Sequence, residues 1–162
     1  MGEKRQLPVF TINYRGRIEL DSLIRFIRDW LVNKNFFFNE KKHKFRTDER
    51  EVFMEADRKI TGYIRWYLDI QLRGLPIHPC EIETPEGKVP GWEGNFSIDF
   101  TGYFLADWQN AWKGDFAEAL DFFFRKFIMR QDLEHYYEDN LLMLIDNLRR
   151  DVQNKIGMEV VH

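Results

Sequence analysis

The sequence predicts an α+β fold: a curved antiparallel sheet of four to five strands, with N-terminal and C-terminal helices packed on one face. Apolar and polar residues alternate with a period of two in residues 9–20, 52–72 and 95–108, as expected for half-buried strands. Apolar residues recur every three or four positions in residues 22–34 and again in the C-terminal third, as expected for amphipathic helices.

The first strand covers residues 9–20, and the first helix is expected over residues 22–34. Asp21 is suited to the N-cap of this helix because its carboxylate can accept backbone N–H groups. Asn35 can adopt the left-handed conformation that ends a helix. A second, more exposed strand is expected over residues 36–46.

The alternating stretch 52–72 is too long for one ordinary strand, since about 3.3 Å per residue would make it roughly 65 Å long. We expect it to bend or break at the polar segment 55–59, with Gly62 close behind. Residues 73–95 hold four of the five prolines and four of the ten glycines, which predicts an irregular region containing a small hairpin around Pro85-Glu86-Gly87.

Two helices are expected near the C-terminus. Asp115 followed by Glu118 forms a capping box before the segment "FAEALDFFFRKFIMR". The segment "NLLMLIDNLRRDVQNKI" carries an apolar stripe at helical spacing.

Three glycines stand at apolar positions of the expected strands: Gly16, Gly62 and Gly102. Glycine weakens the interior of a strand, so it needs a local reason there. If the three align across neighbouring strands, they form a crease that lets a helix approach the sheet or lets the sheet curl. The alternative is that they are unrelated and mark separate bulges.

The chain of 162 residues is long enough to bury a substantial core, and we expect residues 1–162 to form a single domain. The formal net charge of −3 does not indicate a surface for duplex nucleic acid. Cys80 is the single cysteine, so no intrachain disulfide can form. No apolar run approaches the roughly 18 residues of a membrane span. A cytoplasmic protein without a membrane partner is therefore expected.

Two segments, "RGRIELDSLIRFIRDWLV" and "GYFLADWQNAW", resemble a family of small uncharacterised archaeal proteins. The resemblance implies the same order of strands and helices over most of the chain. It implies no activity, cofactor or functional residue.

Two groups of residues could carry chemistry. His78 and Cys80 are two residues apart and could pair as base and nucleophile, although an incidental cysteine in a proline-rich loop is the favoured interpretation. Asp132, His135 and Asp139 have the helical spacing of metal ligands, which a solvated acidic helix face explains equally well. Motifs for nucleotides, catalytic zinc or paired cysteines are absent, so we assign no catalytic residue, metal or cofactor.

The most basic stretch is residues 40–46, "EKKHKFR". It could contact phosphates. The favoured interpretation is a solvated strand whose lysines protect a sheet edge from pairing with other chains.

The polar side of the expected sheet is the main candidate site. Exposed tyrosine and arginine on a rigid sheet are typical of protein interfaces, and also of platforms that bind single-stranded nucleic acid. The interspersed aspartates favour a protein contact, because they would repel phosphates. Ordinary cross-strand pairs that only stabilise the sheet remain the alternative. The expected interaction face comprises Arg15, Arg17, Tyr63, Arg65, Tyr67, Asp69, Asp99 and Tyr103.

The sequence thus favours a non-enzymatic structural or protein-interaction module that forms a homo-oligomer, or binds another protein, through this face. The second hypothesis is a small RNA-binding or single-stranded DNA-binding module that uses Tyr63, Arg65, Tyr67 and Tyr103. An enzyme of unknown reaction is the third.

Overall fold

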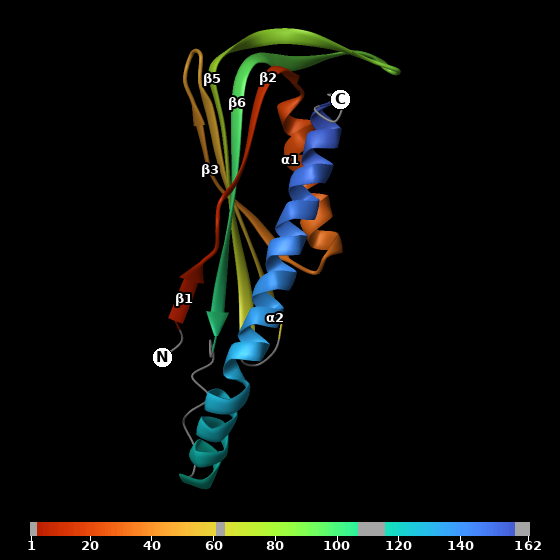
Figure 1. Cartoon of the computed structure of the whole chain (residues 1–162). Helices are drawn as coiled ribbons and strands as arrows, with labels where there is room; N and C mark the ends of the chain where they lie inside the picture. Colours follow the sequence, from red (N-terminus) through yellow and green to blue (C-terminus); the bar gives the residue numbers. More distant parts are fainter. Residues whose placement is uncertain (1–2, 61–63, 107–115, 158–162) are drawn as a thin grey trace.

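The computed structural model describes residues 3–60, 64–106 and 116–157, with α2 side chains described from His135 onward. Figure 1 shows the elements in chain order. They are β1 (Glu3–Gln6), β2 (Phe10–Ile18), α1 (Leu20–Asn33), β3 (Phe37–Phe45), β4 (Arg50–Lys59), β5 (Ile64–Thr84), β6 (Gly87–Ala106) and α2 (Phe116–Ile156).

The strands form one antiparallel sheet in which β3, β4, β5 and β6 are neighbours in chain order. On its other side β6 pairs with both β1 and β2, which follow one another along its length. The longest pairing joins β5 to β6, and these two strands form the centre of the sheet.

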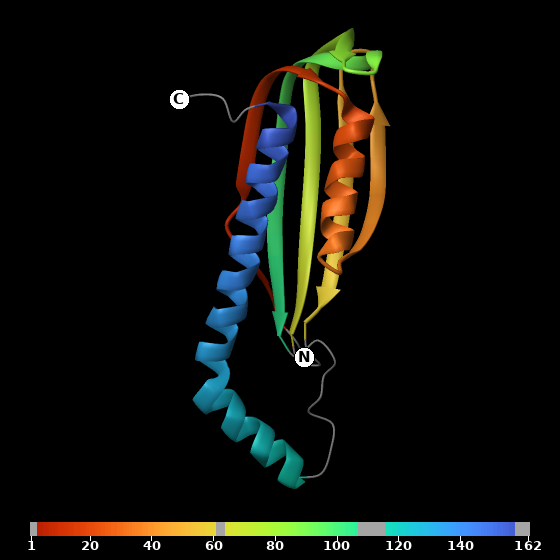
Figure 2. The ribbon, with the colours of Figure 1, turned by 90° about the vertical axis from the view of Figure 1, so that its right-hand side faces the viewer.

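Both helices stand in front of the same face of the sheet (Figure 2). α2 contacts β2 and β6, and α1 contacts β3. The first turns of α2 extend beyond the end of the sheet (Figure 2). No helix in the described ranges is both long and apolar enough to cross a lipid bilayer. The core joins fully buried side chains of the helices and the sheet, among them Leu23, Ile27, Leu31, Leu68, Ile70, Phe100, Leu141, Ile145 and Leu148.

The α+β class and the antiparallel sheet are confirmed, whereas the number of strands and the positions of the helices differ from the expectation. The described part of the chain contains six strands. The expectation differs because it lacked β1 and took the stretch 52–72 as one strand, whereas this stretch divides between β4 and β5. The two expected C-terminal helices are one continuous helix of 41 residues.

The start of α1 also differs from the expectation. Its N-cap is Glu19, which makes no side-chain capping bond, and Asp21 lies within the first turn. The chain turns from β2 into α1 directly, because Ile18 and Leu20 are both buried in the core. Asn35 does adopt a left-handed conformation, with φ of 67°. The predicted capping box at Asp115 lies outside the described residues.

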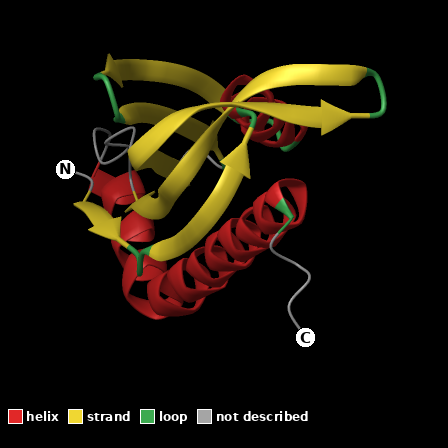
Figure 3. Ribbon diagram, turned by 90° about the horizontal axis from the view of Figure 1, so that it is seen from above, coloured by secondary structure: helices red, strands yellow, loops and turns green. Residues whose placement is uncertain are grey.

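Residues 73–95 are not irregular but continue the β5–β6 hairpin, which extends past the end of β4. We call residues 78–92 the arm. Its turn falls at Pro85-Glu86-Gly87 as predicted, between the paired residues Thr84 and Gly87. The arm bends towards the helix side of the sheet (Figure 1) and extends outwards when seen from above (Figure 3).

The arm bends where the register of β5 shifts between Gly74 and Ile77. Gly94 of β6 lies against this shift, and a Cβ atom there would be 2.1 Å from the carbonyl oxygen of Pro76. Only glycine permits so close an approach of two backbones.

Of the three glycines, the two that are described do not align across the sheet, which favours the second interpretation, that the glycines are unrelated. Gly16 pairs with Gly94, whereas Gly102 pairs with Leu68, eight residues further along β6. Gly62 lies outside the described residues. A helix does approach the sheet at Gly102, where a Cβ atom would lie 2.5 Å from Cδ1 of Ile145 in α2.

We predict that Gly102→Ala destabilises the protein, because Ile145 is fully buried and its Cδ1 methyl occupies the required space. Overpacking of this kind typically costs about 1–3 kcal/mol. Ile145→Val removes that methyl, so the cost of Gly102→Ala should fall in the Ile145→Val background by at least about 0.5 kcal/mol. Urea unfolding of the four proteins measures this coupling. If the two substitutions lower the free energy of unfolding in a strictly additive way, Ile145 of α2 does not pack against Gly102.

Candidate interaction face

The open face is the side of the sheet opposite α1 and α2, and strand alternation determines which residues lie on it. In β5, Leu68, Ile70 and Leu72 are fully buried towards the helices. Asp69 and Gln71, which alternate with these leucines and isoleucine, are only half-buried and point to the opposite face. By the same alternation the structure brings seven of the eight predicted residues to the open face: Arg15, Arg17, Arg65, Tyr67, Asp69, Asp99 and Tyr103. Tyr63 lies outside the described residues.

A pair of tyrosines lies at one end of the open face. Tyr67 of β5 is directly opposite Tyr103 of β6. The ammonium group of Lys4, from β1, lies 4.5 Å from the ring centre of Tyr67 and 4.6 Å from that of Tyr103. One cation thus contacts both rings, an arrangement that holds them in place.

Arg65 flanks the tyrosine pair and forms an ion pair with Asp57 of β4, with Nε 3.2 Å from a carboxylate oxygen. This hydrogen bond holds the pKa of Arg65 above its ordinary value. The ion pair with Asp57 outweighs the cost of partial burial, so the guanidinium group stays charged, and its carbon lies 5.5 Å from the centre of the Tyr67 ring.

The acidic hollow lies next to the tyrosine pair and has a volume of about 410 Å³. Its carboxylates are Glu55, Asp69 and Asp99. Glu55 and Asp69 are register partners, so two like charges face each other across β4 and β5. Lys41 of β3 lies 2.5 Å from Glu55, and Asp99 accepts a hydrogen bond of 2.7 Å from Thr11. The hollow is lined by Val9, Lys41, Phe53, Met54, Glu55, Asp69, Ile70, Gln71, Asp99, Thr101 and Tyr103.

Asp69 is the least compensated of these carboxylates. Its burial raises its pKa above the ordinary 3.8, and the neighbouring charge of Glu55 raises it further. Lys4 and Lys41 act in the opposite direction but do not cancel the effect. The centre of the open face therefore carries negative charge that the single chain does not neutralise.

We predict that Asp69→Asn stabilises the single chain at neutral pH. Because the folded pKa is raised, the unfolded chain ionises Asp69 at lower pH than the folded chain does, so ionisation costs folding free energy as the pH rises above 3.8. Well below that pH both states are protonated and the cost vanishes. Urea unfolding at low protein concentration should show a gain at pH 7 that disappears in acid. A variant less stable than the wild type at pH 7 would contradict this.

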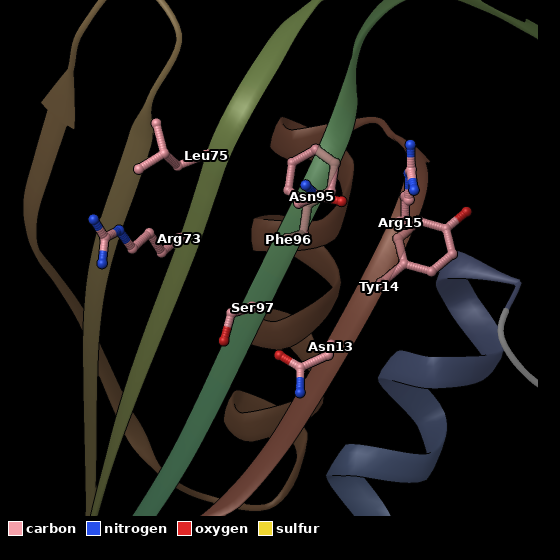
Figure 4. A pocket seen from close by; sticks show the side chains of 8 residues that line it. All are labelled: Asn13, Tyr14, Arg15, Arg73, Leu75, Asn95, Phe96 and Ser97. Atoms are coloured by element: carbon pink, nitrogen blue, oxygen red, sulfur yellow. The ribbon is translucent and has the colours of Figure 1, made fainter.

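The basic hollow lies beside the acidic one, nearer the arm, and has a volume of about 530 Å³ (Figure 4). Two arginines and no carboxylate line it. Arg73 lies 3.5 Å from Glu49 at an exposed position, and Arg15 is exposed on β2. The lining residues are Asn13, Tyr14, Arg15, Arg73, Leu75, Asn95, Phe96 and Ser97.

The predicted residues therefore separate into groups along the strands. Arg65, Tyr67 and Tyr103 are neighbours, and Asp69 and Asp99 share the acidic hollow. Arg15 belongs to the basic hollow. Arg17 lies at the base of the arm, where it forms an ion pair of 3.0 Å with Glu93.

Sequence reasoning missed several charged residues of the open face, among them Lys4, Lys41, Glu55, Asp57 and Arg73. Glu55 and Arg73 continue the alternation of β4 and β5, which was a usable signal. Lys41 sits at the register shift of β3, and β1 has only four residues, so no periodicity could have indicated either lysine.

The other candidate groups gain little from the structure. His78 lies 4.0 Å from Glu93, and neither it nor Cys80 makes a hydrogen bond to the other in the described part of the chain. The described residues contain no group of three metal-ligating side chains, and the Asp132 side chain lies outside them. Residues 40–45 of the basic stretch lie in β3, an edge strand with a register shift between Glu40 and Lys42, as expected for a protected edge.

No protein-family model matches the chain. No curated protein matches it either. Among solved structures, the chain is similar to an uncharacterised protein from Rhizobium leguminosarum, with 8% sequence identity and a TM-score of 0.23. That match covers 95% of this chain and 99% of the other, but at this TM-score it supports no conclusion about fold or function. The resemblance to archaeal proteins remains a sequence-based expectation.

Proposed function

We propose that the chain is a non-enzymatic interaction module of the cytoplasm that self-associates through the open face. The observation that carries this proposal is a sheet with both helices on one side and, on the other, a tyrosine pair beside two hollows of opposite charge. Tyrosine and arginine are enriched at protein interfaces because they offer large contact areas with a polar end.

The charge distribution favours a protein partner over nucleic acid. Lys4, Arg65 and the tyrosine pair could stack bases and contact phosphates. However, Asp57, Glu55 and Asp69 occupy the same face within two strand pleats of the tyrosines. A phosphate backbone would be repelled there, whereas a protein surface can offer cations and anions in a matching pattern. Single-stranded nucleic acid is therefore the second candidate.

We predict that Tyr67→Ala combined with Tyr103→Ala dissociates the oligomer. Truncation of a central interface aromatic often costs about 2 kcal/mol or more, so the dissociation constant should rise at least about 30-fold. The monomer should stay folded, because the core on the helix side is unchanged. Light scattering after size-exclusion chromatography measures the mass, and Tyr136→Ala, at an exposed position of α2, is the matched control.

Two other results would reject the proposal. If the double variant keeps its mass and loses a salt-sensitive affinity for single-stranded nucleic acid, the second candidate is correct. If it keeps both properties and only loses stability, the tyrosines are ordinary cross-strand partners.

A further inference from the structure

We infer that the open face binds a second copy of the chain with its strands reversed, so that the basic hollow of each copy covers the acidic hollow of the other. This inference rests on the proposed function and specifies the arrangement of the two copies. A two-fold interface uses the same patch on both subunits, so the patch must be complementary to itself.

The charges of the two hollows meet this requirement. The acidic hollow contains three carboxylates and one lysine, and that lysine, Lys41, is already bound to Glu55. The basic hollow contains two arginines and no carboxylate, and one of them, Arg73, already lies 3.5 Å from Glu49 outside the hollow. Arg15 is exposed and has no hydrogen bond or ion pair with any described residue. Each copy therefore carries unmatched charges of both signs on one face.

The positions of the hollows also fit. Asp69 and Arg73 are four residues apart on β5, which is about 13 Å at 3.3 Å per residue. Asn95, the register partner of Arg15, lies two residues beyond Ser97, the partner of Arg73. A two-fold axis in the plane of the interface that crosses β5 at Gln71 exchanges the positions of Asp69 and Arg73 and reverses the strand direction. Asp99, the register partner of Gln71, then lies at the axis.

The same operation gives the tyrosine pair a contact. The tyrosine pair lies at the end of the acidic hollow that is farther from the arm, where Tyr103 lines the hollow, and the basic hollow continues to Arg15 and Leu75. Reversal of the strands brings the tyrosine rings of one copy towards Leu75 and Arg15 of the other. Leu75 is 38% exposed in the single chain, and an aromatic ring would cover it.

The arrangement also relieves the repulsion inside the acidic hollow. Glu55 and Asp69 face each other in register, and Lys41, which binds Glu55, only partly offsets the raised pKa of Asp69. A guanidinium group from the second copy would lie over both carboxylates and form charge-assisted hydrogen bonds with them.

Charge reversal in two complementary variants tests this arrangement. One variant carries Arg15→Glu and Arg73→Glu, and the other carries Asp69→Lys and Asp99→Lys. Each alone places like charges in both contacts, so its dissociation constant should rise about 100-fold or more. In an equimolar mixture every contact between the two variants is complementary again, so a two-chain mass should return. Sedimentation equilibrium of the separate and mixed proteins measures this.

Arg25→Glu with Arg28→Glu is the matched control, because it makes the same change of charge on the exposed side of α1. It should keep the wild-type mass. Recovery in the mixture also shows that both variants are folded. If the wild type and the separate reversal variants form the same oligomer while the tyrosine variant does not, the arrangement is wrong but self-association through the open face stands. A wild type that is a single chain at all concentrations would reject both.

Discussion

The pairing of β5 with β6 fixes which side chains meet the helices and which form the open face. Side chains alternate between the two faces of a strand, so a shift of one residue would move Leu68 to the open face and Tyr67 into the core. The fully buried Leu68, Ile70 and Leu72 prevent that shift, because all three would lose their contacts with the core at once. The position of the tyrosine pair is thus a consequence of core packing.

Of the described elements, α1, α2 and the arm all lie on the helix side or bend towards it, so none of them covers the open face. The arm bends that way at the register shift after Gly74. Its base is held by Arg50, whose guanidinium carbon lies 3.7 Å from the Phe45 ring centre and 4.3 Å from that of Trp92. The backbone N–H of Ile77 also donates to the backbone carbonyl oxygen of Asp48, 2.9 Å away. These contacts tie the arm to the β3–β4 hairpin and leave the hollows open to a partner.

The sequence predicted the features that depend on periodicity. The strand β2, the helix α1, the exposed strand β3 and the turn of the arm at Gly87 all follow local patterns that packing did not override. The polar side of the sheet was predicted for the same reason. What could not be predicted depends on pairing between distant segments: the contact of Gly94 with Pro76, the place of β1 beside β6, and the separation of Arg15 from Asp69 into two hollows. A propensity argument also placed the N-cap at Asp21, whereas burial of Leu20 moved it to Glu19.

The molar mass of the purified wild-type chain is the most direct measure of whether the open face is an interface. Light scattering should be recorded over a range of protein concentrations, before and after nuclease treatment. Self-association through the open face predicts a mass of about two chains that falls towards one chain on dilution and does not change with nuclease. A single-chain mass at every concentration, or a mass that falls only after nuclease treatment, would contradict it.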